Sequence, residues 1–348
     1  MSEIVIIGTG KLNSSLNIYS RDLREATGRE RIILAISKEQ QSSISHYDDK
    51  TEIGYLPKFV GSGWTVNNLF GGLIFHRVRN KLKGKTIHYT TFGLPLISHN
   101  DDDIVTLHDM IFLDPIDEHY RKAFNLTKHL LDRFLNFDHV TTPSEFVKNQ
   151  LIEYGFTGKI DAVYHPVAKE FKFMKDKKAI RKQLRLPDNK VLILSISTNL
   201  KRKNLGTVKA AVESMGSDYR LVRVGQKVGD SITFSNLNTE ELNLIYNACD
   251  LLLFPTLAEG MGKPVVEAFA AGLPAVTSNI EVMREICGEA ALIVEPTVEG
   301  CVNGIKEILA SVDEFSKKGI ERAELFSREK FAKKMNDYYE NIESGRDY

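Results

Sequence analysis

The sequence predicts an α/β protein with two doubly wound parallel sheets, one in each of two domains. Short apolar runs alternate with amphipathic stretches along the chain, which is the pattern of repeated βαβ units. The chain has 348 residues, about twice the length of a typical single domain. A charged, mostly basic stretch at residues 168–188 interrupts the alternation, and we interpret it as a linker that runs into a small helix.

These observations place an N-terminal domain at residues 1–167 and a C-terminal domain at residues 168–326. The last segment, 327–348, begins with a helix rich in lysine, glutamate and aromatic residues, and we expect it to pack back on the first domain. Ligands of doubly wound sheets bind beyond the carboxyl ends of the strands. We therefore expect the site in a cleft between the two domains.

The elements follow from the apolar runs and their flanking turn residues. In the first domain we expect strands at 4–7, 31–35, 86–89, 104–107 and 140–142, with helices at 13–27, 119–136 and 144–154. In the second domain we expect strands at 191–197, 221–225, 251–254, 274–277 and 291–294. Asn238, followed three residues later by Glu241, predicts a capping box that opens a helix to Cys249.

Composition excludes several classes of protein. The hydrophobic fraction is 42% and the charged fraction 26%, which suits a globular protein with a full core. Lys+Arg and Asp+Glu both number 46, so no overall charge recruits nucleic acid. The 3 cysteines form no Cys-x-x-Cys pair and suit reduced thiols. With no signal peptide or membrane span in the pattern, we expect a cytoplasmic protein.

The strongest candidate site is the run 259–268, EGMGKPVVEA, which follows an apolar strand. Pro264 suits the first turn of a helix, and Gly272 suits its C-terminal cap, so the glycines fall in a strand-to-helix loop. Free amides in such a loop and the positive end of the helix dipole bind phosphate. Glu259 and Glu267 flank the loop, where they suit the hydroxyl groups of a sugar and a ribose. A tight turn with two surface glutamates explains the pattern equally well.

Two further runs follow strands. The run 197–204, STNLKRKN, holds consecutive cations that could neutralise a diphosphate, although a solvated loop is the simpler alternative. His108 ends a strand of the first domain and could hydrogen-bond a substrate hydroxyl, or form a local pair with Asp109. Gly8, Thr9 and Gly10 follow the first strand but lack the third glycine of a dinucleotide fingerprint. We interpret these three residues as a loop that admits the acceptor or the donor phosphate.

Four segments resemble family 4 retaining glycosyltransferases, which have the GT-B fold of two Rossmann-like domains. The run EGMGKPVVEAFAAGLPAVTS is similar to the family's Glu-x7-Glu signature. TLHDMIFLDP resembles its His-Asp segment, HVTTPSEFVKNQLIEYG the segment before its interdomain crossing, and STNLKRKNL the basic loop of its donor domain. Together the segments cover most of residues 104–294 in the family's order, whereas the first hundred residues match loosely.

The resemblance implies a metal-independent, retaining hexosyltransferase of EC 2.4 type that needs no cofactor. Its donor would be a nucleotide-diphosphate sugar, and its acceptor a saccharide or a lipid-linked saccharide. The implied catalytic residues are His108, Glu259, Lys203 and Arg202. The implied donor-binding residues are Thr198, Phe234, Ser235, Gly260, Met261, Gly262, Lys263 and Glu267. Many family members carry arginine at the position of Thr198, and Arg202 could compensate for its absence.

Two other functions fit parts of the sequence. A nucleotide-sugar-binding subunit with weak catalysis would keep the same residues, and Thr198 leaves this alternative open. An NAD-dependent oxidoreductase would explain the glycines after the first strand, but the second strand ends without the acidic residue that binds ribose. Asp101, Asp102 and Asp103 imitate a metal-binding Asp-x-Asp motif, yet they precede a strand, so we expect a polar turn.

Residues 66–85 form a basic, partly apolar segment in the first domain. The run 76–85, HRVRNKLKGK, follows several apolar residues, and such a segment could make a peripheral contact with anionic lipid. A solvated helix end is the alternative, because cations also favour the C-terminal end of a helix dipole.

Overall fold

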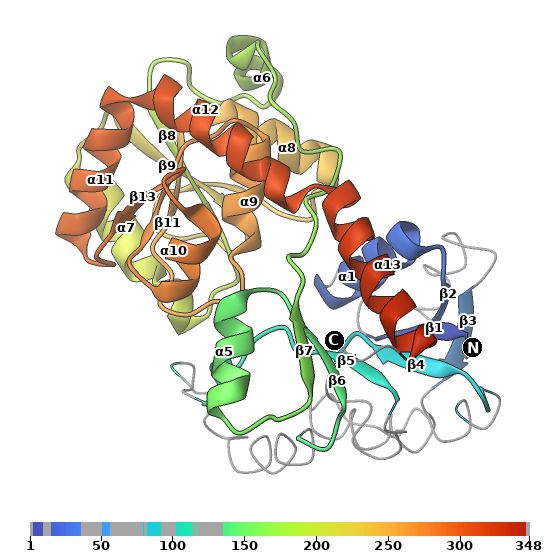
Figure 1. Cartoon of the computed structure of the whole chain (residues 1–348). Helices are drawn as coiled ribbons and strands as arrows, with labels where there is room; N and C mark the ends of the chain where they lie inside the picture. The colour runs from blue at the N-terminus through green and yellow to red at the C-terminus, as the bar shows by residue number, and fades with distance from the viewer. Residues whose placement is uncertain are drawn as a thin grey trace. The chain divides into compact units, whose positions relative to one another are not determined.

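The computed structural model describes residues 3–9, 15–35, 51–55, 79, 82–91, 102–113, 116 and 135–345 (Figure 1). The chain divides into two compact units. The N-terminal unit comprises Met1–His165 and Glu329–Tyr348, and the C-terminal unit comprises Pro166–Arg328. Each unit contains one parallel sheet, as the alternating pattern predicts.

The N-terminal unit has a seven-stranded sheet in the order β3-β2-β1-β4-β5-β6-β7. Its strands are β1 (Ile4–Thr9), β2 (Glu30–Ala35), β3 (Thr51–Tyr55), β4 (Thr86–Tyr89), β5 (Ile104–Thr106), β6 (His139–Thr142) and β7 (Lys159–Ala162). Its described helices before the C-terminal segment are α1 (Ser15–Thr27), η1 (Ile111–Leu113) and α5 (Glu145–Glu153). The predicted strands are confirmed to within two residues, whereas β3 and β7 were not predicted. The helix expected at 119–136 lies almost entirely outside the described residues.

The C-terminal helix α13 (Arg328–Ser344) belongs to the N-terminal unit, where it lies beside α1 in Figure 1. Its buried face is formed by Phe331, Met335, Tyr338 and Tyr339, which share a core cluster with residues of β1 and α1. Burying aromatic side chains of this size stabilises the contact by an amount on the order of 2 kcal/mol each. The hydrophobic effect thus holds the end of the chain on the first sheet.

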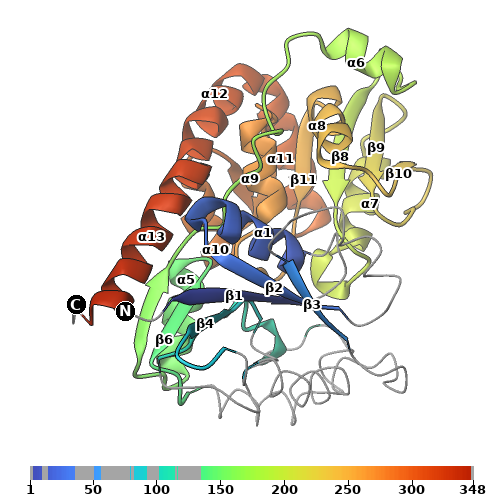
Figure 2. The same cartoon turned by 90° about the vertical axis from the view of Figure 1, so that its right-hand side faces the viewer.

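The C-terminal unit has a six-stranded sheet in the order β10-β9-β8-β11-β12-β13. Four of its strands, β10, β9, β8 and β11, are labelled side by side in Figure 2. The strands are β8 (Val191–Ile196), β9 (Tyr219–Val224), β10 (Ile232–Phe234), β11 (Leu251–Phe254), β12 (Ala275–Ser278) and β13 (Leu292–Val294). The helices are α6 (Lys177–Gln183), η2 (Lys201–Lys203), α7 (Leu205–Ser214), α8 (Thr239–Ala248), α9 (Lys263–Ala270), α10 (Glu281–Cys287), α11 (Val298–Ala310), α12 (Val312–Ala323) and η3 (Glu324–Phe326). The predicted capping box of α8 is present.

The basic stretch 168–188 is folded against the C-terminal unit and is not a free linker. α8 contributes two asparagines to this contact: Asn243 accepts a hydrogen bond from the Lys172 amide at 3.1 Å, and Asn247 accepts one from the Met174 amide at 2.7 Å. The sequence did not predict this packing, because the stretch is highly charged and its hydrogen-bonding partners are polar side chains on a distant helix. The predicted small helix within it is α6.

The three cysteines, Cys249, Cys287 and Cys301, are buried and unpaired. Burial raises the pKa of Cys287 to about 12 and that of Cys301 to about 11, and it raises the pKa of Cys249 as well. Because the thiolate is the reactive form, we expect no cysteine of the native protein to react quickly with a disulfide reagent at pH 8. Three thiols should react after denaturation. Fast reaction of a native thiol would contradict this packing.

Candidate functional site

The strongest candidate site begins where β11 ends and α9 starts. Gly262, the N-cap of α9, has φ 80° and ψ 49°, a left-handed conformation that favours glycine. A Cβ at this position would lie 2.3 Å from Cε of Met283. Pro264 occupies the first turn, as predicted, and no side chain caps the helix. The first-turn amides of α9 therefore form the start of a potential anion site.

Glu259 gathers polar partners from two loops. Its Oε1 accepts hydrogen bonds from Lys203 Nζ and, at 2.9 Å, from Thr256 Oγ1. Arg202 Nη1 lies 3.4 Å from the same oxygen. The exposed fraction is only 10% for the Glu259 and Lys203 side chains and 13% for Arg202. The structure thus joins the two runs that the sequence singled out separately, in surroundings where water screens charge weakly.

Backbone contacts fix the basic loop against the end of β11. The carbonyl oxygen of Arg202 accepts from the Leu257 amide at 2.7 Å, and Arg202 Nη1 donates to the Ala258 carbonyl at 3.1 Å. Lys203 Nζ lies 5.3 Å from the centre of the Phe254 ring, within cation–π range. The two cations are therefore held in place by the protein. Thr256 was not singled out from the sequence, because a threonine after a strand carries no distinguishing signal.

Glu267 lies inside α9 and is 91% buried, by its 9% exposed fraction. Among the described residues its carboxylate has one hydrogen-bond partner, Tyr246 of α8, whose hydroxyl donates to Oε2 at 2.7 Å. Burial raises the pKa of Glu267, while Lys263 and the Tyr246 hydrogen bond act in the opposite direction. Tyr246 was missed in the sequence because it falls on the apolar face of α8 and reads as a core residue. The ribose-binding role of Glu267 stays a prediction.

The remaining donor-side residues lie at the other strands of the same sheet. Phe234 is half-buried and ends the edge strand β10, where its carbonyl accepts from the Gly225 amide at 3.0 Å. Thr198 and Ser235 are exposed just beyond the carboxyl ends of β8 and β10. Since the strands are parallel, these residues share a sheet edge with the start of α9. Gly260 and Met261 are buried in the loop before α9, and Lys263 is its first residue.

In the N-terminal unit, His108 is half-buried and donates from Nε2 to the Thr90 carbonyl at 2.8 Å. Its ring also makes edge contacts with Tyr19 and His165, each with 5.1 Å between ring centres. Because a carbonyl oxygen can only accept, the bond to Thr90 requires a hydrogen on Nε2 of His108. The role of His108 in contacting the donor sugar stays a prediction.

The expected loop at residues 8–10 starts later than predicted. Gly8 and Thr9 lie in β1, paired with Ile33 and Leu34 of β2, and Gly10 lies outside the described residues. A Cβ on Gly8 would lie 2.7 Å from Oγ of Ser20. The close approach of α1 to the strand thus explains the glycine, and the role of this segment in admitting the acceptor or the donor phosphate stays a prediction.

The structure describes parts of two other motifs of the first domain, the run 101–103 and the basic segment 66–85. Asp103 is buried, and its carboxylate accepts from Arg79 at 2.7 Å and from the Ile87 amide at 3.0 Å. Arg79 is part of the basic segment 66–85, of which residues 66–78, 80 and 81 lie outside the described residues. Leu82 packs in the core. In the described part of the chain, no helix is both long and apolar enough to span a membrane.

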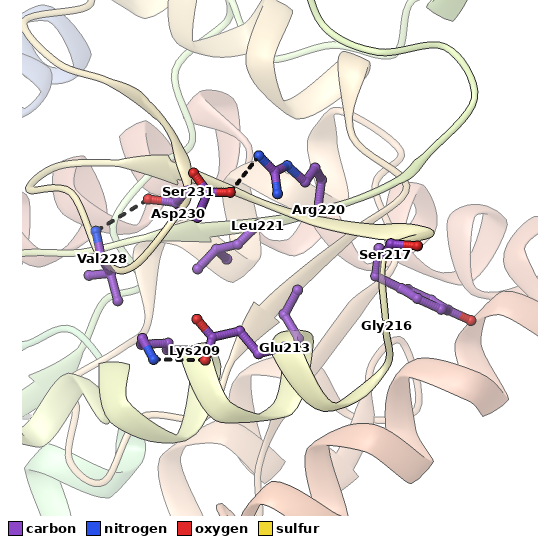
Figure 3. Close-up of a pocket in the computed structure, with 11 residues that line it drawn as sticks. Lys209, Glu213, Gly216, Ser217, Arg220, Leu221, Val228, Asp230 and Ser231 are labelled. Atoms are coloured by element: carbon purple, nitrogen blue, oxygen red, sulfur yellow. Dashed lines mark hydrogen bonds and ion pairs between the residues drawn. The ribbon is translucent and has the colours of Figure 1, made fainter.

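A separate cavity of about 290 Å³ lies between α7 and the start of β9 (Figure 3). Two ion pairs border it, Lys209 with Glu213 at 2.7 Å and Arg220 with Asp230 at 2.8 Å. None of its lining residues belongs to the Glu259 cluster. Its polar groups are engaged with one another, and it adds nothing to the candidate site.

The family match of this chain falls within one of its two units. Residues 176–326, all within the C-terminal unit, match the family described as glycosyl transferases group 1. The chain is 29% identical over 117 residues to O-antigen chain mannosyltransferase B of Escherichia coli. This alignment covers 32% of the chain and 30% of that relative, so the match spans less than a third of the relative's length.

Solved structures show the fold over nearly the whole chain. Sucrose-phosphate synthase from Thermosynechococcus elongatus has a TM-score of 0.80 at 18% identity, covering 99% of this chain and 100% of the other. HepE of Anabaena, in complex with UDP-glucose, has a TM-score of 0.77 at 13% identity, covering 98% and 100%.

The chain therefore has the GT-B fold, as the resemblance predicted. More particularly, its C-terminal unit is similar to the domain described as glycosyl transferases group 1. The match also argues against the oxidoreductase alternative. Membership of family 4 and the individual site roles stay predictions.

Proposed function

We propose that this protein is a retaining glycosyltransferase that moves a hexose from a nucleotide-diphosphate sugar to a hydroxyl acceptor. The observation that carries the proposal is the Glu259 cluster, in which one carboxylate, two cations and the start of α9 meet at one sheet edge. The UDP-glucose complex of HepE, a protein of the same fold, supports a nucleotide sugar as donor. The mannosyltransferase relative supports a saccharide acceptor.

The cluster suits stabilisation of a leaving diphosphate. Negative charge grows on the diphosphate as the glycosidic bond breaks, and Arg202, Lys203 and the first amides of α9 would stabilise that charge. Glu259 would bind hydroxyls of the transferred sugar through the carboxylate oxygen that Lys203 and Thr256 do not occupy. Glu267 would bind the ribose, and His108 would contact the sugar near the reacting carbon.

The first experiment is a screen of nucleotide sugars for thermal stabilisation, because a ligand that binds only the folded state raises the midpoint. The best donor is then incubated with saccharide acceptors, and the anomeric configuration of the product is read by NMR. Retention of configuration supports the proposal, and inversion overturns the retaining step. Binding without release of nucleoside diphosphate would favour the alternative of a non-catalytic nucleotide-sugar-binding subunit.

We predict that transfer continues in saturating EDTA. Fixed cations can replace a metal ion on a diphosphate, and Arg202 and Lys203 are placed to do so. Asp103, of the Asp-x-Asp-like run, is already occupied by Arg79. Loss of transfer in EDTA with recovery on adding magnesium or manganese would contradict the metal-independent mechanism.

The acceptor half is the part of the proposal that rests most on the sequence. A lipid-linked saccharide and a peripheral contact through residues 66–85 remain part of it, with a cytoplasmic location. Within this segment Arg79 and Lys85 already form ion pairs, with Asp103 at 2.7 Å and Glu30 at 3.0 Å. A lipid contact would therefore use the segment's other cations.

A further inference from the structure

Arg223 of β9 is the largest fully buried side chain among the described residues, with 0% exposed area. A buried arginine is uncommon unless a carboxylate compensates its charge. The same unit offers a direct comparison in Arg181, which is 6% exposed and donates from Nη2 to Asp250 Oδ2 at 2.7 Å. Arg181 thus follows the rule for buried cations.

The hydrogen-bond acceptors of Arg223 are all neutral. Nη1 donates to the carbonyl oxygen and Oγ of Ser195, each at 3.0 Å, and lies 3.3 Å from Ser197 Oγ. Nη2 donates to the Ser197 carbonyl at 2.9 Å, and Nε lies 3.5 Å from the Gln226 carbonyl. Burial lowers the pKa of Arg223 to about 10, so the guanidinium stays charged at neutral pH. In the part of the chain that the structure describes, its contacts include no carboxylate.

This charge lies at the carboxyl end of β8, where the chain enters the basic loop of the candidate site. Ser197 follows β8, which lies between β9 and β11 in the sheet, and α9 begins after β11. The same loop runs from Ser197 to Lys203. At Gly225, where φ is 130°, a Cβ would lie only 2.5 Å from the Ser197 carbonyl oxygen. The backbone at Gly225 therefore lies close to the Ser197 carbonyl oxygen, which also accepts a hydrogen bond from Arg223.

We propose that Arg223 is a positioning residue whose uncompensated charge and bonds to Ser197 give the C-terminal unit its preference for a diphosphate over an uncharged ligand. The proposal rests on the proposed function and adds a residue to it. Its buried N–H groups donate to Ser195 and Ser197 and are not available to a ligand. Arg223 would therefore act through the electric field of its charge and by fixing the end of β8. Thr198, where a direct cationic contact would be expected, is exposed and neutral.

The test compares Arg223→Met, which removes the charge, with Arg223→Lys, which keeps it. The probes are UDP, GDP and ADP and the matching nucleosides, measured by calorimetry or competition. We expect Arg223→Met to weaken diphosphate binding at least about tenfold while nucleoside binding changes less than about threefold, since the lost field acts on the phosphates. Arg223→Lys should keep the ratio of the two affinities within about threefold of the wild type.

Arg181→Met is the matched control, because it removes a buried arginine whose charge is already paired. It should lower the thermal midpoint and leave the affinity ratio unchanged. Equal loss of diphosphate and nucleoside binding in Arg223→Met would overturn the proposal, as would a loss in Arg223→Lys as large as in Arg223→Met. If Arg223→Met does not fold, Arg223→Gln makes the same comparison. Absence of any diphosphate binding in the wild type would instead overturn the proposed function itself.

Discussion

Glu259→Gln should lower turnover at least about 100-fold and leave the protein folded. The amide has nearly the shape of the carboxylate but cannot accept from Lys203, Thr256 and a sugar hydroxyl with the same strength. Loss of one preorganised charged contact in a site of low exposure typically costs about 3 kcal/mol of transition-state stabilisation. Steady-state transfer with the best donor measures the effect, and circular dichroism checks the fold.

Glu281→Gln is the matched control for this substitution. Glu281 is the first residue of α10, which follows β12 at the same sheet edge, and its side chain is exposed. It is therefore a carboxylate one strand away from the site and outside the Glu259 cluster. A loss in Glu281→Gln similar to that in Glu259→Gln would show that general charge at this edge, rather than the Glu259 cluster, supports transfer.

Strong local signals explain why much of the fold was predictable. The strand at 251–254 is a continuous apolar run, and it occurs at the predicted bounds, as does the strand at 86–89. Asn238 and Glu241 form the predicted capping box because both of its hydrogen bonds lie within four residues. Such elements depend on neighbours in sequence, so the sequence alone contains most of what determines them.

The missed features depend instead on distant partners. Strand β10, Ile232–Phe234, is only three residues long and exists because its backbone pairs with β9. Gly8 looked like part of a loop, since the closeness of Ser20 to it is a tertiary contact. Tyr246 falls on the apolar face of its helix, and only the structure shows that its hydroxyl donates to Glu267. A sequence pattern predicts which face of a helix or strand is buried, but it does not predict which atoms of other elements contact that face.

The candidate site shows the same division. The runs containing Glu259 and Lys203 were each recognisable from a strand, a loop and a following helix. Their direct ion pair was not, because the two residues are 56 apart in the chain and meet only when β8 pairs with β11. Arg223 was hidden for a related reason, since a lone arginine in an apolar strand shows nothing about the carbonyl groups that surround it.

Lys203→Ala should also lower turnover at least about 100-fold, and its effect should not add to that of Glu259→Gln. The two residues hold each other in place through Oε1 of Glu259, where Lys203 Nζ and Thr256 Oγ1 donate. Residues that share a partner show coupling, whereas independent residues combine additively in free energy. Two independent losses of this size would multiply to about 10⁴-fold. We expect the turnover of the double variant to be less than about tenfold below that of the less active single variant.

Lys201→Ala provides the control for this cycle, because Lys201 lies in the same short helix η2 and its side chain is exposed. It removes a cation from the loop without touching Glu259, and it should leave turnover within about threefold of the wild type, as exposed charges are well screened. An equal loss in Lys201→Ala would assign the effect to the charge of the loop as a whole. Fully multiplicative losses in the double variant would show that Lys203 acts on the diphosphate independently of Glu259, and the ion pair would then have no part in catalysis.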